Sequence, residues 1–362
     1  MNFNLKHKEF IFKRPSGTSR GVMTVKNSWF ISLSLNTINA TGEFSIIEGL
    51  SPDFKNFEEY ERKLKLVLSD LKSLKESNWS CSSIEDWFAK NQLYQKWQNE
   101  PSILFGIEML VLDYLNGGNQ IYFDNDFSRG KLNIPINGLV WMGDSEFMLS
   151  QIEEKIAQNF TCIKMKIGAI HFDEEIKLIR KIREQFDNSQ IQLRVDANGS
   201  FKIEDAVSKL EALAELEVHS IEQPIAPKQW EAMAELCKAN VLPIALDEEL
   251  IGIVNRSEKI ELLDLVKPHY IILKPSLHGG ILGCKEWINL AEERKIDWWM
   301  TSALESNLGL NCICQFTAEY KNDKPHGLGT GGLYTNNIPS NLNIINGEIR
   351  LLKELSQLNT TI

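Results

Sequence analysis

The stretch LRVDANG, residues 193–199, is a short strand-like run that turns polar at Asp196. A buried parallel strand should be nearly all apolar, so an ionisable side chain at its carboxyl end is costly and needs a reason. The same pattern recurs every 25 to 30 residues, about one strand and one helix, in runs that end at Lys166, Glu222, Asp247 and Lys274. These five positions organise the interpretation of the whole chain.

Eight apolar or β-branched runs of this kind follow one another from about residue 131. They are centred on residues 137–140, 163–166, 193–196, 220–222, 244–247, 271–274, 298–301 and 327–329. Helical patterns such as 173–186, 203–216 and 280–294 fill the gaps. Eight strands alternating with helices in about 200 residues predict an α/β fold of the (β/α) barrel type. A doubly wound open sheet is the alternative, but no Gly-rich dinucleotide fingerprint follows the first strand, which favours the barrel.

The first third of the chain has a different pattern. Residues 3–12, 29–35 and 41–47 are predicted to be extended, with turns between them at Pro15, Gly17, Gly21 and Gly42. Amphipathic helices are predicted at 54–76, 83–98 and 102–116. We therefore expect an α+β domain over residues 1–130, a barrel over 131–334, and a final segment, 335–362, that packs back on the first domain.

Composition excludes several classes of protein. The 362 residues carry 39 Lys and Arg against 49 Asp and Glu, a net charge of −10, which disfavours a nucleic-acid partner. The amino terminus lacks the apolar core of a signal peptide, and no uncharged apolar run reaches the roughly 20 residues of a membrane helix. We expect a cytoplasmic protein with no membrane partner and with its six scattered cysteines reduced.

The strand period of two places the charged side chains on one side. Lys164 and Lys166 point the same way, and so do Arg194, Asp196 and Asn198, while the apolar residues between them face the helices. In a barrel, the five strand-end side chains would surround one axis at the face where barrel enzymes hold their active sites. The alternatives are ordinary surface charges at loop starts and a purely structural network of ion pairs.

The three acids predict a metal centre. Asp196, Glu222 and Asp247 have no histidine or cysteine alongside, so they suit Mg²⁺, or Mn²⁺, rather than Zn²⁺. Such a cation polarises a bound carboxylate and stabilises the enediolate formed when the α proton leaves, so the substrate is predicted to be a small carboxylate. Lys166 is the predicted base, its pKa lowered by Lys164 and the metal. Lys274 would remain protonated or act as a second acid or base on the opposite face.

Five motifs occur in the order found in the enolase superfamily. They are KMKIG at 164–168, RVDANG at 194–199, SIEQPI at 220–225, LDEEL at 246–250 and LKPSLHGG at 273–280, and they resemble the muconate-lactonising subgroup. The resemblance implies an α+β capping domain followed by a modified (β/α)₇β TIM-like barrel. It also implies Asp196, Glu222 and Asp247 as Mg²⁺ ligands, Lys166 as the base and Lys274 on the other side of the substrate, with supporting roles for Lys164, Arg194 and Asn198.

Further stretches resemble the o-succinylbenzoate synthase family of that subgroup. They are TSRG at 18–21, EGLS at 48–51, PSILFGIE at 101–108, INGLVWMG at 136–143, TSALESNLGL at 301–310 and HGLGTG at 326–331. This resemblance implies syn-dehydration of 2-succinyl-6-hydroxy-2,4-cyclohexadiene-1-carboxylate in menaquinone biosynthesis. An N-succinylamino acid racemase and a non-catalytic barrel scaffold stay open as alternatives, as does homo-oligomerisation. No paired-aspartate D-x-D signature follows the last strand, which speaks against a dipeptide epimerase.

The substrate-binding residues are expected on three loops. Ser302 and Glu305 follow the seventh strand, and Gly329 lies in a Gly-rich segment whose N–H groups suit a succinyl carboxylate. Arg20 belongs to the segment 16–21, which resembles the loop that closes over substrate in the superfamily, and could meet a carboxylate.

Overall fold

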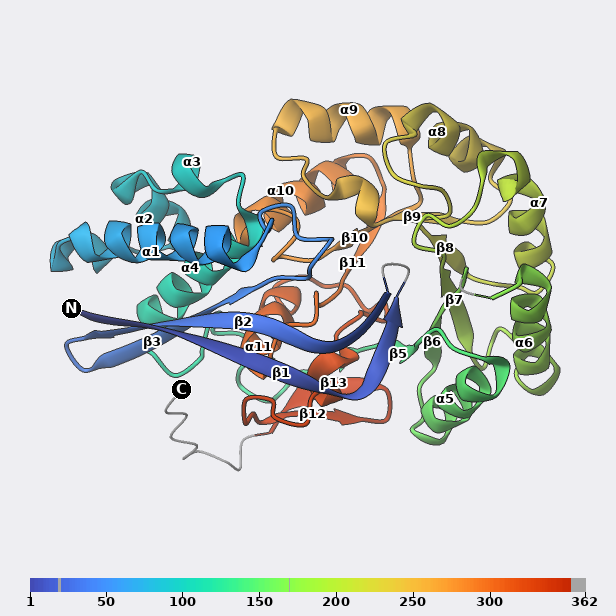
Figure 1. Ribbon diagram of the computed structural model, residues 1–362, viewed down its shortest axis with the longest axis horizontal. Helices are drawn as coiled ribbons and strands as arrows, with labels where there is room; N and C mark the ends of the chain where they lie inside the picture. Colours follow the sequence, from blue (N-terminus) through green and yellow to red (C-terminus); the bar gives the residue numbers. More distant parts are fainter. Residues whose placement is uncertain (19–20, 169, 353–362) are drawn as a thin grey trace.

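The structure of this protein is a computed structural model that describes residues 1–18, 21–168 and 170–352. It has a barrel, an α+β cap built from the first third of the chain, and a small sheet near the carboxyl terminus (Figure 1). None of the helices within these ranges is long and apolar enough to cross a membrane.

The barrel wall is a parallel sheet of seven strands in the order β11-β10-β9-β8-β7-β6-β5. Neighbours in sequence are therefore neighbours in space, as expected for repeated strand and helix units. The chain closes the circle with residues 326–327, which bridge in parallel to Ile136 on one side and Thr301 on the other. The strands are β5 (Gly138–Val140), β6 (Cys162–Lys166), β7 (Gln192–Asp196), β8 (Ser220–Glu222), β9 (Ile244–Leu246), β10 (Tyr270–Leu273) and β11 (Asp297–Met300).

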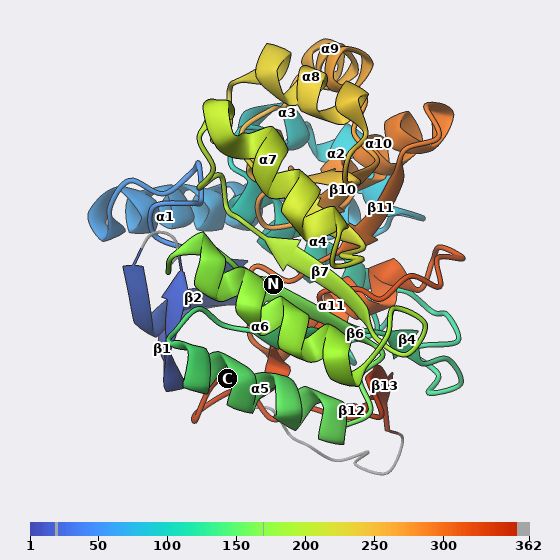
Figure 2. The same ribbon diagram turned by 90° about the vertical axis from the view of Figure 1, so that its right-hand side faces the viewer.

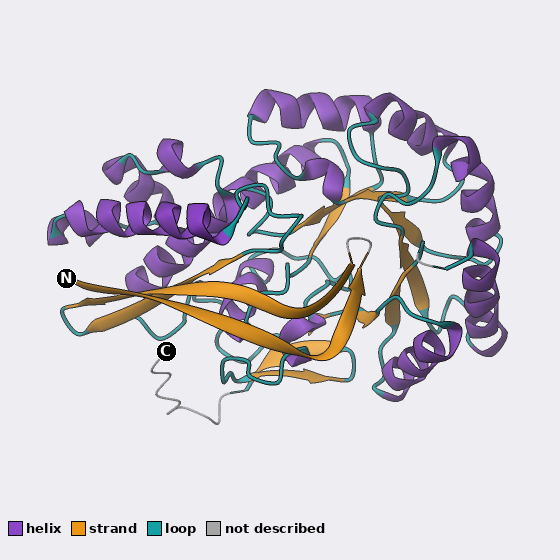
Figure 3. Cartoon of the chain, in the orientation of Figure 1, coloured by secondary structure: helices purple, strands orange, loops and turns teal. Residues whose placement is uncertain are grey.

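One helix follows each of the seven strands and covers the outer face of the barrel (Figure 3). Figure 2 shows α5, α6 and α7 lying side by side on that face. The helices are α5 (Ser145–Ala157), α6 (Phe172–Gln185), α7 (Ile203–Ala214), α8 (Trp230–Ala239), α9 (Arg256–Val266), α10 (Gly280–Glu293) and α11 (Asn307–Thr317), with single 3₁₀ turns η2 (Glu248–Leu250) and η3 (Gly329–Gly332). The predicted (β/α)₇β barrel with an α+β cap is confirmed.

The cap combines an antiparallel sheet with a layer of helices. Its strands pair in the order β1 (Asn2–Thr18), β2 (Gly21–Leu35) and β3 (Ile38–Ser45). Its helices are α1 (Phe57–Ser73), η1 (Glu76–Trp79), α2 (Ile84–Asn91), α3 (Tyr94–Trp97) and α4 (Pro101–Leu115). The single helix predicted over 83–98 is divided into α2 and α3, because Gln92 takes a left-handed conformation with φ 55° that ends α2.

The structure corrects the prediction of a turn at Gly42. This residue does not form a turn between extended segments but lies inside β3, where it pairs with Ile31 of β2. A Cβ atom at Gly42 would clash with the carbonyl oxygen of Gly106 in α4. The glycine is needed because the backbones of the strand and the helix touch here. In the sequence, a glycine required for such a close approach cannot be distinguished from a glycine required for a turn.

The chain that follows the barrel contacts both the cap and the start of the barrel. Thr335 donates its backbone N–H to the Ile11 carbonyl in β1, at 2.9 Å. The chain then forms the hairpin of β12 (Leu342–Ile345) and β13 (Glu348–Leu351), which adds to β4 (Ile134–Pro135) beside the first barrel strand. The part of the predicted returning segment beyond residue 352 lies outside the described residues.

Two buried acids of the cap cover the amino ends of barrel helices. Glu108 in α4 accepts the backbone N–H groups of Ile281 and Leu282 at the start of α10. Glu43 in β3 accepts the N–H groups of Ser306 and Gly309 at the start of α11, at 2.9 and 3.0 Å. The first N–H groups of a helix have no partner within the helix, and its amino end attracts negative charge, so these acids join the two domains.

Candidate active site

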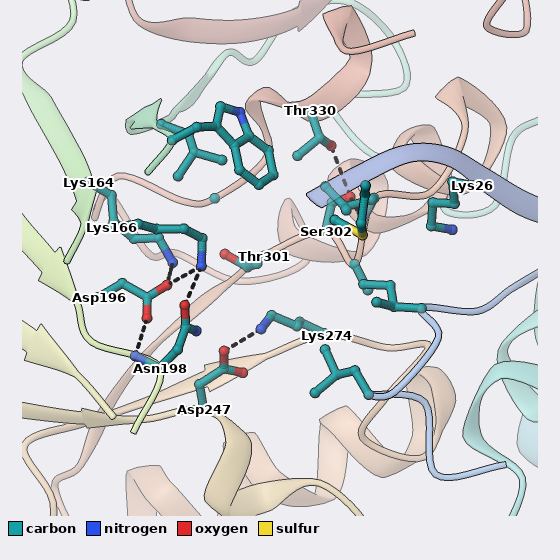
Figure 4. A pocket seen from close by; sticks show the side chains of 18 of the residues that line it. Lys26, Lys164, Lys166, Asp196, Asn198, Asp247, Lys274, Thr301, Ser302 and Thr330 are labelled. Atoms are coloured by element: carbon teal, nitrogen blue, oxygen red, sulfur yellow. Dashed lines mark hydrogen bonds and ion pairs between the residues drawn. The ribbon is translucent and has the colours of Figure 1, made fainter. Parts of the chain in front are cut away.

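A cavity of about 420 Å³ lies between the cap and the carboxyl ends of the barrel strands. The cap contributes residues 21–27 of β2 and residues 46–48 and 50 after β3, most of them apolar. The barrel contributes a group of charged side chains, which Figure 4 shows converging from opposite sides. The charged members are Lys164, Lys166, Asp196, Glu222, Asp247, Glu248 and Lys274.

Lys164, Lys166 and Asp196 form one side of this group. The Lys164 ammonium donates to Oδ2 of Asp196 at 2.9 Å and to Oε2 of Glu222 at 2.6 Å. The Lys166 ammonium donates to Oδ2 of Asp196 and to Oδ1 of Asn198, both at 2.9 Å. The register explains the proximity, because Lys164 pairs with Arg194, Lys166 with Asp196, and Asp196 with Glu222 across β6, β7 and β8.

Lys274 and Asp247 form the other side. Lys274 follows β10, and its ammonium contacts Oδ2 of Asp247, the residue after β9. Asn198 lies near both sides, since its Nδ2 donates to Oε1 of Glu248 at 2.9 Å. The two lysines that the sequence proposes as acid and base, Lys166 and Lys274, thus approach the row of carboxylates from different strands of the barrel (Figure 4).

Burial and charge together set the protonation of this cluster. Burial by itself would raise the pKa of Asp196, but the ammonium groups of Lys164 and Lys166 outweigh it and hold the pKa well below its usual range. Burial lowers the pKa of Lys164, yet Asp196 and Glu222 raise it above its ordinary value. Glu222 has a raised pKa, first because it is buried and then because Asp196 and Asp247 stand beside it. Negative charge is therefore crowded around Glu222.

The carboxylates fit a divalent cation. As the side chains stand, no group of three His, Cys, Asp or Glu residues within the described ranges is arranged to hold a metal. The ammonium groups of Lys164 and Lys274 lie against the carboxylate oxygens instead. However, Oε1 of Glu222 and Oδ1 of Asp247 are buried and have no hydrogen-bond partner among the described residues. Two orphaned oxygens in an all-carboxylate set that is crowded with negative charge are suited to a hard cation.

The predicted substrate-binding residues divide into two groups. Asn198, Ser302 and Gly329 line the cavity. Glu305 does not: it is fully buried behind Ser302, whose hydroxyl donates to Glu305 Oε2 at 2.7 Å. Thr330 donates to the Ser302 hydroxyl at 2.9 Å. The hydrogen bonds with Glu305 and Thr330 together fix the orientation of the Ser302 hydroxyl, and Glu305 does so from behind the cavity wall. Arg20 lies outside the described residues.

The structure corrects the prediction that Arg194 supports the active site from within the cavity. The Arg194 guanidinium stacks 4.1 Å from the ring centre of Trp299 and donates to the Pro325 carbonyl at 2.8 Å, and it does not line the cavity. Arg194 shares a side of β7 with Asp196, as predicted, but two residues of strand separate them by roughly 6.6 Å along the barrel. The strand period gives the side on which a residue points and not its depth, so Arg194 lies below the cavity.

Three charged residues of the cavity were not predicted from the sequence, namely Lys26 and Glu48 of the cap and Glu248 of the barrel. Glu248 follows the predicted ligand Asp247, and the 3₁₀ turn η2 brings it back to the cavity wall. Lys26 comes from the middle of β2 in the cap and lines the cavity. Glu248 could have been suspected from the LDEEL motif, whereas no spacing or motif in the first third of the chain distinguishes Lys26 from its neighbours.

Comparison with known proteins agrees with this geometry. The family described as enolase C-terminal domain-like matches residues 148–354. The o-succinylbenzoate synthase of Desulfotalea psychrophila is 46% identical over 363 residues, which cover 96% of this chain and 98% of that protein. The N-succinyl-L-Arg/Lys racemase of Bacillus cereus is 27% identical over 210 residues, 58% of this chain and 56% of that protein.

Comparison with solved structures points to the same family as comparison of sequences. The crystal structure of MenC from Desulfotalea psychrophila superimposes with a TM-score of 0.86 at 42% identity, covering 97% of this chain and 99% of that one. This similarity extends over cap and barrel together. The chain therefore belongs to the enolase superfamily and, within it, to the o-succinylbenzoate synthase family.

Proposed function

We propose that the protein dehydrates 2-succinyl-6-hydroxy-2,4-cyclohexadiene-1-carboxylate to o-succinylbenzoate, a step of menaquinone biosynthesis, with Mg²⁺ as cofactor. The observation that carries the proposal is that Lys166 and Lys274 line one cavity together with the three carboxylates Asp196, Glu222 and Asp247. The similarity to the Desulfotalea psychrophila synthase over nearly the full length of both chains supports the choice of substrate.

Asp196, Glu222 and Asp247 would hold the cation. When bound, Mg²⁺, or Mn²⁺, would stabilise the negative charge that builds on the substrate carboxylate as the α proton leaves. The ammonium groups of Lys164 and Lys274 already contact these acids and contribute positive charge to the same place. The carboxylate end of the substrate is therefore assigned to this side of the cavity.

Lys166 is assigned the proton transfers. In its free-amine form, Nζ takes the proton from the carbon next to the substrate carboxylate. The same Nζ then gives this proton to the hydroxyl that leaves from the same face, so the C–H and C–O bonds break, one water forms and the ring becomes aromatic. Asp196 and Asn198 hold Lys166 in position at 2.9 Å each. Lys274, held by Asp247, would stabilise the anionic ring from the opposite face.

The test is turnover of the cyclohexadiene substrate by the purified protein, with and without EDTA. We expect aromatisation that EDTA abolishes and that added Mg²⁺ or Mn²⁺ restores. In Lys166→Ala, the loss of a general base should lower kcat by at least about 10³-fold. Metal-independent turnover, or full activity of Lys166→Ala, would contradict the mechanism. Absence of turnover by the wild type would leave a racemase or a non-catalytic scaffold.

Racemisation of an N-succinylamino acid is the second candidate. The observation in its favour is that Lys166 and Lys274 approach from different sides, as two-base inversion of a carbon centre requires. Proton exchange of N-succinylamino acids in D₂O is the discriminating measurement. Racemisation predicts that Lys166→Ala and Lys274→Ala each abolish exchange from one enantiomer only, whereas a dedicated dehydratase exchanges neither.

The domain division is also a proposal. We assign residues 1–130 to the cap, 131–334 to the catalytic barrel and 335–362 to a segment that returns to the cap. The hydrogen bond from Thr335 to Ile11 supports the return, and the pairing of β13 with β4 adds a contact beside the barrel. The cytoplasmic location and the oligomeric state stay predictions.

A further inference from the structure

Lys26 differs from the other lysines of the cavity in having no acidic partner. Lys164, Lys166 and Lys274 each contact a carboxylate. The Lys26 ammonium contacts the hydroxyl of Ser45, and no carboxylate of the described residues lies within ion-pair distance of it. The residue is only 4% exposed, although it lines the cavity. A buried ammonium without a counter-charge is unfavourable in the free protein, so it calls for a ligand.

The two acids that act on Lys26 electrostatically, Glu43 and Glu305, accept hydrogen bonds from other donors. Glu43 accepts the hydroxyls of Ser28 and Ser306 and two backbone N–H groups of α11. Glu305 accepts the hydroxyls of Ser276 and Ser302. These acids attract Lys26 at longer range, yet burial outweighs them and lowers the pKa of Lys26. Lys26 thus lies buried at the cavity wall without an ion-pair partner among the described residues, and an anionic ligand would stabilise its charged form.

The position of Lys26 defines a second polar end of the cavity. Figure 4 shows Lys26 on the side of the cavity where Ser302 and Thr330 lie, away from Lys166 and Asp196. Apolar side chains of the cap and barrel, including Met23, Ile47 and Leu304, line the cavity as well. A ligand that suits this lining has one anionic group for the barrel site, an apolar body, and a second anionic group for the cap.

We propose that Lys26 binds the distal carboxylate of a dicarboxylate substrate, which is the succinyl carboxylate if the proposed function is right. This inference rests on the proposed function for the identity of the ligand and not for the site itself. It assigns to the cap a direct role in choosing the substrate, since a ligand without the second carboxylate leaves the Lys26 ammonium buried and unpaired. Lys26 acts in binding and takes no part in proton transfer.

The test is calorimetric titration in Mg²⁺ with o-succinylbenzoate and with its analogue whose succinyl carboxylate is a carboxamide. Lys26→Met keeps most of the side-chain volume and removes the charge. Loss of a charge-assisted hydrogen bond should weaken o-succinylbenzoate binding by about 10 to 100-fold. Binding of the carboxamide, already weak in the wild type, should change less than about 3-fold. Lys13→Met, an exposed lysine of β1, is the matched control and should leave both affinities unchanged.

Turnover gives a second measurement of the same site. In Lys26→Met the loss should appear mainly in KM, because the proton-transfer residues are intact. Lys26→Gln, which retains a donor for Ser45, is the second variant in case the methionine variant does not fold. Equal loss for both ligands in the variants, or no loss for either, would overturn the assignment.

The two proposals fail differently. A wild type that does not aromatise the cyclohexadiene, yet binds dicarboxylates more tightly than carboxamides through Lys26, refutes the proposed function and retains the Lys26 site. A wild type that turns over the substrate, with a carboxylate preference that persists in Lys26→Met, refutes the Lys26 site alone. A wild type that neither turns over nor distinguishes the two ligands refutes both.

Discussion

The Lys166 ammonium donates a 2.9 Å hydrogen bond to Oδ1 of Asn198, whose backbone takes a left-handed conformation with φ 44°. Asparagine is one of the few residues with a Cβ that adopts this conformation readily. The unusual backbone turns the amide toward the cavity, where it links Lys166 on one side to Glu248 on the other. Asn198 is therefore a positioning residue for the proposed base.

Asn198→Ala should separate this positioning role from a structural one. We expect kcat to fall by about 10 to 100-fold with little change in KM, because Lys166 then keeps Asp196 alone of its two partners among the described residues. The left-handed backbone should also cost about 1 kcal/mol of stability with alanine. Asn36→Ala, at φ 55° in the exposed turn between β2 and β3, is the control for that strain and should retain full activity. Equal kinetics in the two variants would contradict the role.

Lys164→Met should destabilise the protein in a metal-dependent way. Removing the ammonium that bridges Asp196 and Glu222 leaves the buried Glu222 without an ion-pair partner among the described residues and leaves Asp196 with Lys166 alone, so we expect a loss of about 3 to 5 kcal/mol in EDTA. Mg²⁺ should restore part of this stability and should therefore raise Tm more in the variant than in the wild type.

Lys259→Met is the matched control for the lysine variant. Lys259 is also buried and pairs with Glu286 at 2.8 Å, but it does not line the catalytic cavity. It should lose stability without any added response to Mg²⁺. A Lys164→Met variant whose melting is indifferent to Mg²⁺ would argue against a cation on these carboxylates.

Gly280→Ala should weaken the contact between cap and barrel. A Cβ at Gly280 would clash with the Glu108 carboxylate, and the backbone has φ 72°. We expect a loss of about 3 kcal/mol by urea denaturation, which combines backbone strain with weakened hydrogen bonds to α10. Gly252→Ala, at φ 87° with no atom within 4 Å of the new Cβ, isolates the strain and should lose about 1 kcal/mol. The idea fails if the two losses are equal.

His326 should make the protein less stable in mild acid. Its Nδ1 accepts the Met300 N–H at 2.9 Å, and burial lowers its pKa to about 4. Between pH 6.5 and 4 the unfolded chain binds a proton that the folded protein does not, so stability falls as the pH falls through this window. From pH 7.5 to pH 5, we expect His326 to account for a loss of about 2 kcal/mol.

The measurement is urea denaturation at both pH values. His326→Asn keeps an acceptor for Met300 and removes the titrating group, so the difference between pH 7.5 and pH 5 should be smaller by that amount. An unchanged pH dependence in His326→Asn would show that other groups are responsible. Lys13→Met, which changes an exposed lysine of β1 and leaves His326 in place, should retain the dependence of the wild type.

The barrel and most of the cavity could be predicted from the sequence because both follow from a repeated local pattern. Charged residues at the ends of consecutive parallel strands must meet at one end of a barrel, and this rule brought together Lys166, Asp196 and Lys274. Depth along the barrel axis is not part of that rule, which is why Arg194 was expected in the cavity and lies below it.

Contacts between the domains could not be predicted in the same way. Lys26 and the barrel residue Ser302 are 276 positions apart, and their shared cavity depends on how the cap sheet is placed over the barrel. The sequence alone predicts a turn at Gly42, because the helix that touches this glycine, α4, begins almost 60 residues later. Local pattern carries no information about such long-range packing.

The acids that the cap places on the barrel helices affect how new activities can be made from this scaffold. A cap grafted from a relative without acids at the positions of Glu43 and Glu108 would leave the first N–H groups of α11 and α10 without acceptors. A chimera would therefore lose its fold before its specificity could be measured. Recombination between family members should therefore transfer each acid together with the helix start that it caps. The contact between cap and barrel is then preserved, and residues such as Lys26 can be exchanged to change specificity.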